Sequence, residues 1–298
     1  MKLPVLAAGF VGPPLSFPLP LIWSISVPGA VRAIALAREA ESLLVRDARH
    51  NLSLFNPRGE LQGRCTWKDL AAGCLSDDGS AIAAVVAERV CWLGQDLSVR
   101  WEKKIAARGI AAALDPFGQY LAVSDHQAEL WLFDRTGKLL GRFNSPRAIQ
   151  HLAFVPVLPL LMAAADFGWA GCLDLSTGKW TWSDRPVSQI GGLTVAAAGD
   201  PTILACFSEG LRGCGPDGGN RFSLHLPKPC GLAALNFAGD KGVAAGLGKE
   251  NYGFNRKGDV LVTVALPQPP TALALSALGE RLICGFADGT LMARKFEM

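Results

Sequence analysis

The chain is poor in charge and in the short motifs that mark catalytic, metal-binding and nucleic-acid-binding sites. Only 18% of its 298 residues are charged, and its formal net charge is +3. This mild charge argues against a dedicated nucleic-acid binder, which carries concentrated basic character. None of the eight cysteines forms a Cys-x-x-Cys pair, so a zinc site of the usual spacing is not expected. A Gly-x-Ser-x-Gly nucleophile motif and a glycine-rich phosphate loop are also missing.

Charge is absent altogether from residues 3–31. Such a stretch suggests a membrane span or an export signal, but six prolines interrupt it and only Lys2 precedes it, which fits neither kind of segment. We therefore expect no transmembrane segment. Residues 1–19 are predicted to form a proline-rich arm that packs on the side or bottom of a single domain spanning residues 20–298. The alternative is a polyproline-like docking strip for another subunit.

The chain also lacks the apolar period of a helical repeat, and instead it repeats itself seven times at intervals of about 40 residues. One residue just before each turn of small residues marks a unit. These marks are Leu36, Leu75, Leu114, Phe154, Ala197, Asn236 and Leu275. An apolar position seven residues after each mark opens a run of small and β-branched residues, namely Leu43, Ile82, Leu121, Leu161, Leu204, Val243 and Leu282.

The third unit shows best what a repeat contains. Its apolar runs are residues 109–114, 120–123, 129–133 and 138–140, and turns containing Asp and Gly separate them. Gly supplies the positive φ of such turns, and Asp accepts hydrogen bonds from backbone donors, so each unit reads as four strands joined by hairpins. A four-stranded antiparallel sheet repeated at this spacing is the blade of a β-propeller, in which both faces of each blade are buried. The sequence therefore predicts an all-β fold with seven blades, in agreement with its hydrophobic content of 50%.

The two ends of the chain complement each other. The seventh unit, residues 271–298, has room for only three strands, whereas a spare strand precedes the first unit at residues 21–27. We predict that this strand, at about residues 20–28, pairs with residues 289–296. The pairing would close the ring and remove its open edges.

Residues 172–182 resemble the Asp-x-x-Thr-Gly-Lys-x-x-Trp signature of quinoprotein-like propeller blades, in which the Trp docks between neighbouring blades. Residues 134–138 are similar but have no Trp at the corresponding place. The first-hairpin turns also resemble those of WD-repeat propellers, although the typical Gly-His and Trp-Asp dipeptides are absent. The resemblance implies membership of the WD-repeat and quinoprotein-like superfamily, without a subfamily. It does not imply quinone-dependent catalysis, because quinoprotein dehydrogenases typically have eight blades and an adjacent Cys-Cys pair.

Most tryptophans lie in or beside the expected outer strands, where their rings would fill the widening gap between blades. They are Trp23, Trp67, Trp101, Trp131, Trp180 and Trp182. An exposed ring would instead mark a partner surface.

The cysteines are expected to fill the core. Cys206 and Cys284 each fall nine residues after their mark, in the strand of small residues. Free cysteine is among the most buried residue types. Cysteines that fill the core, with no Cys-x-x-Cys pair among them, predict a reducing compartment, and hence a cytoplasmic protein.

The sequence offers no catalytic set, so we expect no catalytic residue, no cofactor and no metal ligand. The histidines His50, His126, His151 and His225 lie in different units at different offsets. The acids Asp77, Asp115, Asp174 and Asp217 lie in repeated turns, where capping of backbone donors is the ordinary explanation. The alternative is a hydrolase or small-ligand binder with its site at the channel mouth, similar to propeller hydrolases that gather single acids from several blades.

Cations recur in the connections that lead from one unit to the next. They are Arg32, Lys68, Arg108, Arg147, Arg185 and Lys228, with Gln268 in the seventh connection. Ring closure would bring them to one rim, where they would focus a positive potential and receive an acidic peptide, a phosphorylated segment or another anion. The ordinary alternative is a set of isolated, solvated charges.

From these observations we expect a non-enzymatic interaction scaffold or a structural subunit of a larger assembly. Its partners would be proteins, engaged through loops at the channel mouth and at the blade edges. Nucleic acid is not expected as a partner.

Overall fold

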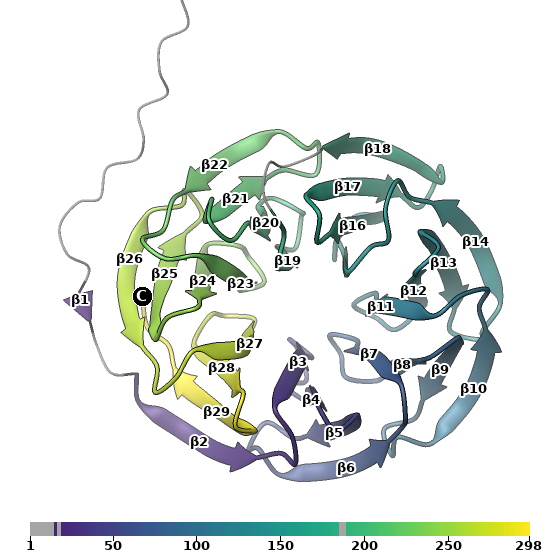
Figure 1. Ribbon diagram of the computed structural model, residues 1–298, viewed down its shortest axis with the longest axis horizontal. Helices are drawn as coiled ribbons and strands as arrows, with labels where there is room; N and C mark the ends of the chain where they lie inside the picture. The colour runs from purple at the N-terminus through teal and green to yellow at the C-terminus, as the bar shows by residue number, and fades with distance from the viewer. Residues whose placement is uncertain (1–14, 17–18, 185–188) are drawn as a thin grey trace, which may run out of the picture.

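Seven antiparallel sheets stand around a common axis, and the predicted seven-bladed β-propeller is confirmed (Figure 1). The computed structural model describes residues 15–16, 19–184 and 189–298, and every regular element in these ranges is a strand. Four strands of each blade run from the channel to the periphery, and we call them first to fourth in that order. We call the contact between two neighbouring blades a seam and number it by its blades.

The first four blades each use four consecutive strands. Blade 1 contains β3 (Val31–Leu36), β4 (Leu43–Asp47), β5 (Asn51–Phe55) and β6 (Leu61–Thr66). Blade 2 contains β7 (Leu70–Leu75), β8 (Ile82–Val86), β9 (Arg89–Leu93) and β10 (Val99–Lys104). Blade 3 contains β11 (Gly109–Leu114), β12 (Tyr120–Asp125), β13 (Glu129–Asp134) and β14 (Leu139–Asn144). Blade 4 contains β15 (His151–Phe154), β16 (Leu160–Ala165), β17 (Trp169–Asp174) and β18 (Lys179–Asp184).

The last three blades follow the same order until the chain ends. Blade 5 contains β19 (Gly192–Val195), β20 (Thr202–Ala205), β21 (Leu211–Cys214) and β22 (Asn220–Leu224). Blade 6 contains β23 (Cys230–Leu235), β24 (Lys241–Gly246), β25 (Glu250–Asn255) and β26 (Val260–Ala265). Blade 7 contains β27 (Pro270–Leu275), β28 (Arg281–Phe286), β29 (Thr290–Lys295) and the N-terminal β2 (Leu21–Ser26).

The N-terminal strand closes the ring as predicted. β2 pairs antiparallel with β29, with Trp23 opposite Ala293 and Ser26 opposite Thr290. Ahead of it, the short β1 (Leu15–Ser16) pairs in parallel with β26 and gives blade 6 a fifth strand, which the sequence did not predict. The rest of the predicted arm, residues 1–14 and 17–18, lies outside the described residues.

The pattern of burial follows the packing of blade against blade. All five residues of β8 are buried, whereas exposed and half-buried residues alternate along the outer strands β2, β6 and β14. A middle strand touches neighbouring blades on both faces, so small and β-branched residues fill it. An outer strand has one face toward water and needs only every second residue to be apolar.

Strand pairing corrects two of the repeat marks. The residue that ends the first strand and pairs with the residue seven positions later is Val195 in blade 5 and Leu235 in blade 6, not Ala197 and Asn236. The turn after Val195 is rich in alanine, so composition alone did not show where the strand ends. The correction removes the shared offset of two cysteines: Cys284 lies within β28, whereas Cys206 follows the end of β20.

The two faces of the ring carry different loops. Each first strand begins at a connection from the previous blade and ends at the first turn, so connections and first turns lie on opposite faces. We call them the connection face and the turn face. On the turn face, backbone hydrogen bonds join the first turns of neighbouring blades into a belt around the axis. The bonds are Glu39 N to Asp77 O, Asp77 N to Pro116 O, Val157 N to Ala197 O, Ala197 N to Phe237 O, and Phe237 N to Ala277 O. Ala40 N and Asp78 N add second bonds to the carbonyls of Asp77 and Pro116.

Aromatic side chains close several seams near the periphery. Trp23, Trp101 and Trp182, each in a fourth strand, donate their indole N–H to a carbonyl in the third turn of the next blade, at 2.8 to 3.1 Å. Each ring packs on a glycine with positive φ in that turn, namely Gly59, Gly137 or Gly218, where a Cβ would lie 3.0 Å or less from the ring. Trp182 therefore docks as the resemblance implies. All eight tryptophans are buried or half-buried, so none of them forms an exposed partner patch.

Candidate functional site

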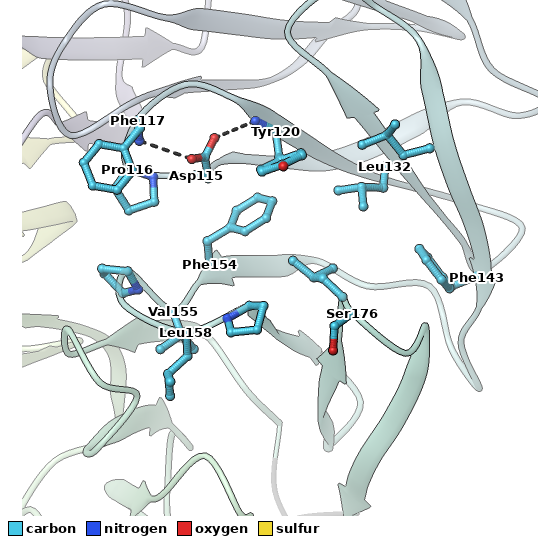
Figure 2. Close-up of a pocket in the computed structure, with 14 residues that line it drawn as sticks. Asp115, Pro116, Phe117, Tyr120, Leu132, Phe143, Phe154, Val155, Leu158 and Ser176 are labelled. Atoms are coloured by element: carbon cyan, nitrogen blue, oxygen red, sulfur yellow. Dashed lines mark hydrogen bonds between the residues drawn. The ribbon is translucent and has the colours of Figure 1, made fainter.

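An apolar pocket of about 450 Å³ opens on the turn face at seam 3/4 (Figure 2). Its walls come from the first turn of blade 3 and from β12, β13 and β14 of that blade, and from β15 and the first and third turns of blade 4. The lining includes Pro116, Phe117, Tyr120, Leu132, Leu140, Phe143, Phe154, Val155, Pro156, Leu158, Pro159 and Leu175, with Asp115 and Ser176 as the polar members. Figure 2 shows the Phe154 ring in the middle, between Tyr120 on one side and Leu158 on the other.

A proline opens the axial end of this seam. In the belt, the first turns of five blades donate a backbone N–H to the next blade, but Pro116, at the donor position of blade 3, has no N–H to donate. Blade 4 has Pro156 at the same position, and there the next residue, Val157, donates instead. In blade 3 the corresponding N–H, that of Phe117, donates to Asp115 Oδ2 at 3.3 Å. Among the described residues, the belt lacks a bond at seam 3/4 and at seam 7/1. The first turns of blades 3 and 4 are therefore not joined, and the pocket lies between them.

A glycine opens the peripheral end of the same seam. We call the fourth-strand position of Trp23, Trp101 and Trp182 the docking position. In blade 2 it is occupied by Trp101, which pairs with Trp92, and in blade 3 it is occupied by Gly141, which pairs with Leu132. Phe143, two residues further on, packs over Gly141 and reaches Gly178 of blade 4, where a Cβ would lie 3.1 Å from its ring. Because the Phe143 ring extends from a position two residues beyond the docking position, it leaves the space beside Leu132 and Leu140 unfilled, and this space is part of the pocket.

The Asp115 carboxylate and the Ser176 hydroxyl of the pocket are already used, and Ser176 donates to Asp174 Oδ1 at 2.5 Å. The Asp115 carboxylate accepts hydrogen bonds from the backbone N–H groups of Phe117, Gln119 and Tyr120, at 2.5 to 3.3 Å. This confirms the capping role predicted for Asp115. Because the carboxylate is turned into its own loop, the pocket offers chiefly carbon surface to a ligand.

The other predicted turn acids divide into two groups. Asp174 and Asp217 cap their turns, and hydrogen bonds from Ser176 and from the Gly219 amide, respectively, hold the pKa of each carboxyl below its usual 3.8. Asp77 is different, because its carboxylate pairs with Arg38 at 2.6 Å and accepts no hydrogen bond from its own turn. The capping role predicted for Asp77 is therefore wrong.

A second pocket of about 450 Å³ lies at seam 7/1, the other gap in the belt. Its lining is charged where that of seam 3/4 is apolar. It includes Arg38, Glu39, Glu41, Glu280, Arg281 and Lys295. Arg281 pairs with Glu41 across the seam at 3.1 Å, so these charges largely satisfy each other.

The channel mouth on the turn face is almost entirely apolar. A cavity of about 290 Å³ is lined there by first strands, with Ile34, Leu36, Leu193, Leu235 and Leu273 among the residues. Arg38, Asp77 and Thr194 supply its polar side chains. The Arg38 guanidinium from blade 1 lies 5.2 Å from the centre of the Phe237 ring of blade 6, so it extends across this mouth.

The predicted basic rim lies on the connection face, opposite the pockets. Lys68, Arg108, Arg147 and Lys228 are exposed in their connections, whereas Arg32 is the second residue of β3 and not part of a connection. Arg185 lies outside the described residues. Arg108 pairs with Asp69 at 3.1 Å, Lys228 pairs with Glu250 at 3.4 Å, and Gln268 donates to Asp288 at 2.6 Å. Among the residues with described contacts, Arg32, Lys68 and Arg147 have no acidic partner.

The histidines are spread over the same face. His50 and His126 lie in turns between second and third strands, His225 lies in the connection into blade 6, and His151 begins β15. His151 Nε2 lies 3.1 Å from Asp166 Oδ1, a pair that sequence spacing did not reveal. Within the described ranges, no three His, Cys, Asp or Glu side chains are grouped closely enough to hold a metal ion together.

The eight cysteines are all free thiols, and only Cys65 is not fully buried. Burial raises the pKa of Cys74 and of Cys284 to about 12. Thiols with such values remain protonated and act as small core residues, as predicted.

No protein-family model matches the chain, and no curated protein matches its sequence. No helix in the described part of the chain is long and apolar enough to cross a bilayer. The architecture is that of a β-propeller.

Two of the features that form the seam 3/4 pocket were visible in the sequence. One is the missing Trp after residues 134–138, which leaves Gly141 at the docking position. The other is Pro116 in a first turn. Their shared effect was not foreseen, because the belt of backbone bonds that Pro116 interrupts exists only in the closed ring.

Proposed function

We propose that this protein is a non-enzymatic interaction platform that binds an apolar segment of a protein partner in the pocket at seam 3/4. A β-propeller is commonly such a scaffold, and the observation that carries the proposal is the apolar, open seam itself. A seam between blades normally has to be filled for stability. Here about 450 Å³ is left open and apolar on the surface.

Exposed apolar side chains around the opening support the proposal. Phe117, Tyr120, Leu140, Val157 and Leu158 are between 40% and 61% exposed. They come from neighbouring turns and strands of blades 3 and 4, so they form one patch together with the pocket. Contiguous apolar patches of this kind mark interaction sites on soluble proteins, and an aromatic pocket at the centre is the usual seat of a hot spot.

Affinity purification of matched surface variants tests the proposal. Phe117→Glu and Leu158→Glu should lose the partner that copurifies with the wild-type protein. The control is Leu278→Glu, which changes a residue 69% exposed in the first turn of blade 7 on the same face. Thermal melts should show all three variants folded. A wild-type protein that purifies only as a lone monomer, or a partner retained by both pocket variants, would refute the proposal.

A second surface is proposed on the connection face, where an acidic or phosphorylated segment of a partner would meet the basic rim. Unpaired Arg32, Lys68 and Arg147 favour it, whereas the ion pairs of Arg108 and Lys228 reduce the contribution of those two cations. A flat dependence of affinity on salt would argue against this surface, because exposed charges are screened.

The alternative of a hydrolase or small-ligand binder rests on the pair of His151 with Asp166 near the connection-face mouth. It predicts that His151→Gln abolishes a turnover measurable with ester or phosphoester substrates. The interaction platform predicts no such turnover in the wild-type protein.

We further propose a relationship to the WD-repeat and quinoprotein-like propellers, and a cytoplasmic location. The docking of Trp182 on Gly218 supports the first, because it is the contact that the shared motif implies. The eight free thiols support the second.

A further inference from the structure

One blade carries an arginine at a position where the other six carry small residues. The position lies in the second strand of each blade. It is equivalent in all blades, because its residue pairs with the third residue before the end of the first strand. The seven residues are Arg46, Val85, Ser124, Ala164, Ala205, Ala245 and Gly285. The repeat thus acts as an internal comparison, and it shows that the architecture does not require an arginine there.

Arg46 is half-buried, and one of its donor atoms has no partner. Its Nε is fully buried and has no hydrogen-bond partner among the described residues. The adjacent Asp47 carboxylate is already occupied by the backbone N–H groups of Gly29, Arg49 and Asn51 and by the Asn51 side chain, at 2.8 to 3.2 Å. A buried donor without a partner is costly to a fold, so packing alone would favour the valine or alanine of the other blades.

A second arginine lies beside it. Arg32 falls at a β-bulge, where the pairing of β3 with β4 shifts between Val31 and Ala33, and its side chain is exposed. A bulge re-aims the side chain that it contains. Burial and the positive charge of Arg32 lower the pKa of Arg46, and the negative charge of Asp47 partly opposes them. The effect of Arg32 indicates that the two arginines lie near each other.

A third cation comes from the neighbouring blade. The equivalent of Arg46 in blade 2 is Val85, whose Cγ1 lies against Gly109 at the start of the next first strand. By the same geometry, Arg46 is directed toward the start of β7. Lys68 lies in the connection that enters β7, is exposed and has no ion pair among the described residues, while its neighbour Asp69 is held by Arg108.

We propose that Arg32, Arg46 and Lys68 form a binding site for an oxyanion group, a carboxylate or a phosphate, carried by a segment of a protein partner. The inference rests on the proposed role as an interaction platform. It places the anion-binding part of the connection face at seam 1/2. Guanidinium groups bind planar carboxylates and phosphates through paired N–H donors. An oxyanion here would satisfy the orphaned Nε and separate the two like charges.

Fluorescence anisotropy with labelled peptides tests the site. One probe carries a run of glutamates, a second carries a single phosphoserine in a neutral sequence, and a third is the same neutral sequence unmodified. The full-length wild-type protein should bind at least one of the first two and not the third. Arg46→Val, which installs the residue of blade 2, should weaken that binding at least tenfold, and Arg32→Gln should do the same.

Two controls separate binding from folding. Arg58→Gln removes an exposed cation from the turn face and should leave the affinity unchanged. Arg46→Val should keep or raise the melting temperature, because it removes a half-buried cation whose buried Nε has no hydrogen-bond partner among the described residues. Competition by inorganic phosphate should be weak, since a free ion lacks the contacts of the surrounding peptide.

The proposal is overturned if Arg46→Val is folded and binds the acidic probes as well as Arg58→Gln does. It is also overturned if the wild-type protein binds neither acidic peptide, or if single-stranded DNA competes at lower concentrations than either peptide. None of these results depends on the seam 3/4 pocket. The copurification test of Phe117→Glu and Leu158→Glu can therefore succeed or fail independently.

Discussion

Seams 2/3 and 3/4 are built from the same repeat, yet the first is closed and the second holds a pocket. At seam 2/3, Trp101 occupies the docking position and donates to Arg135 O at 2.9 Å, while Asp77 N donates to Pro116 O at 3.0 Å. At seam 3/4, Gly141 and Pro116 replace the two donors. Seam 2/3 is thus held at its periphery by one bulky side chain and at the axis by backbone hydrogen bonds between first turns. Losing both opens a site without disturbing either blade.

Seam 1/2 shows that the bulky group can come from either blade. Gly63 occupies the docking position of blade 1, and Leu97, in the third turn of blade 2, stands where other blades have a glycine. Leu97 adopts φ +61° and is only 5% exposed, with its Cδ1 directed at Gly63. A large residue and a small one have exchanged sides, so the seam remains filled. Seam 3/4 has no such exchange.

The largest expected effect is the opening of seam 2/3 by Trp101→Ala. The ring stacks on Trp92, with 5.6 Å between centroids, and packs on Gly137, so its loss should destabilise the fold by about 3 kcal/mol. Phe143→Ala at seam 3/4 should cost less, about 2 kcal/mol, because one side of that ring already faces the pocket. Urea unfolding at 25 °C measures both values. Equal losses would mean that the two seams are packed alike.

The next effect concerns seam 1/2, where Leu97→Gly should destabilise the fold by about 2 kcal/mol. The lost apolar contacts exceed the relief of the left-handed backbone strain, which is on the order of 1 kcal/mol. Adding Gly63→Trp should restore at least half of the loss, because it recreates the Trp-on-glycine contact of seam 2/3. A double-mutant cycle measures the coupling. Simple additivity of the two changes would show that the seams are not interchangeable.

The sequence was sufficient to predict the architecture, because the residues of each blade form a recognisable pattern of strands and turns. The period located the blades, and the surplus strand at Leu21–Ser26 together with the three-strand seventh unit fixed the ring closure. Composition located the strand ends less well where alanine fills both strand and turn, as after Val195. The polar network was harder still, since the pairing of Arg38 with Asp77 spans two blades.

The sites were less predictable than the fold because they depend on neighbours that are distant in sequence. The sequence predicted the cations of the rim, but it did not predict the ion pairs of Arg108 with Asp69 and of Lys228 with Glu250. Arg46 was missed because it lies inside a strand, and its significance appears only when the seven paired positions are compared. Its lack of a partner is likewise a property of the folded chain alone.

Low pH should have a smaller effect on stability. It acts through the acids that cap the third turn of blade 3, at seam 2/3, and the third turn of blade 4, at seam 3/4. Hydrogen bonds from Thr136 and Ser176 are the largest causes that lower the pKa of Asp134 and Asp174, respectively, below the usual 3.8. A lowered pKa in the folded state gives stability that is present above pH 3.8 and is lost as pH falls through the lowered value. The wild-type melting temperature should therefore drop in this acid range, and Asp134→Asn or Asp174→Asn should flatten the drop.

Of the two substitutions, Asp134→Asn should have the larger effect at neutral pH. The turn that Asp134 caps also supplies the carbonyl of Arg135 to Trp101. The turn capped by Asp174 makes apolar contacts, such as that of Gly178 with the Phe143 ring, and accepts no indole N–H among the described residues. Melting curves of both variants between pH 7 and pH 2.5 measure the difference. Curves that run parallel to that of the wild-type protein would show that these caps do not couple the seams to pH.

The smallest effect on stability, but the most direct test of why seam 3/4 is open, comes from Pro116→Ala. The new N–H can donate to the carbonyl of Pro156, the belt position of blade 4, and gain about 1 kcal/mol. The loss of a proline makes the unfolded chain more flexible and offsets much of that gain, so the net change should stay within about 0.5 kcal/mol. Hydrogen exchange gives the sharper measurement: the amide that the substitution introduces should be protected like that of Asp77, and binding of an apolar dye to the turn face should decrease. If the introduced amide exchanges as fast as a free turn, the belt does not extend across this seam and Pro116 is not what holds it open.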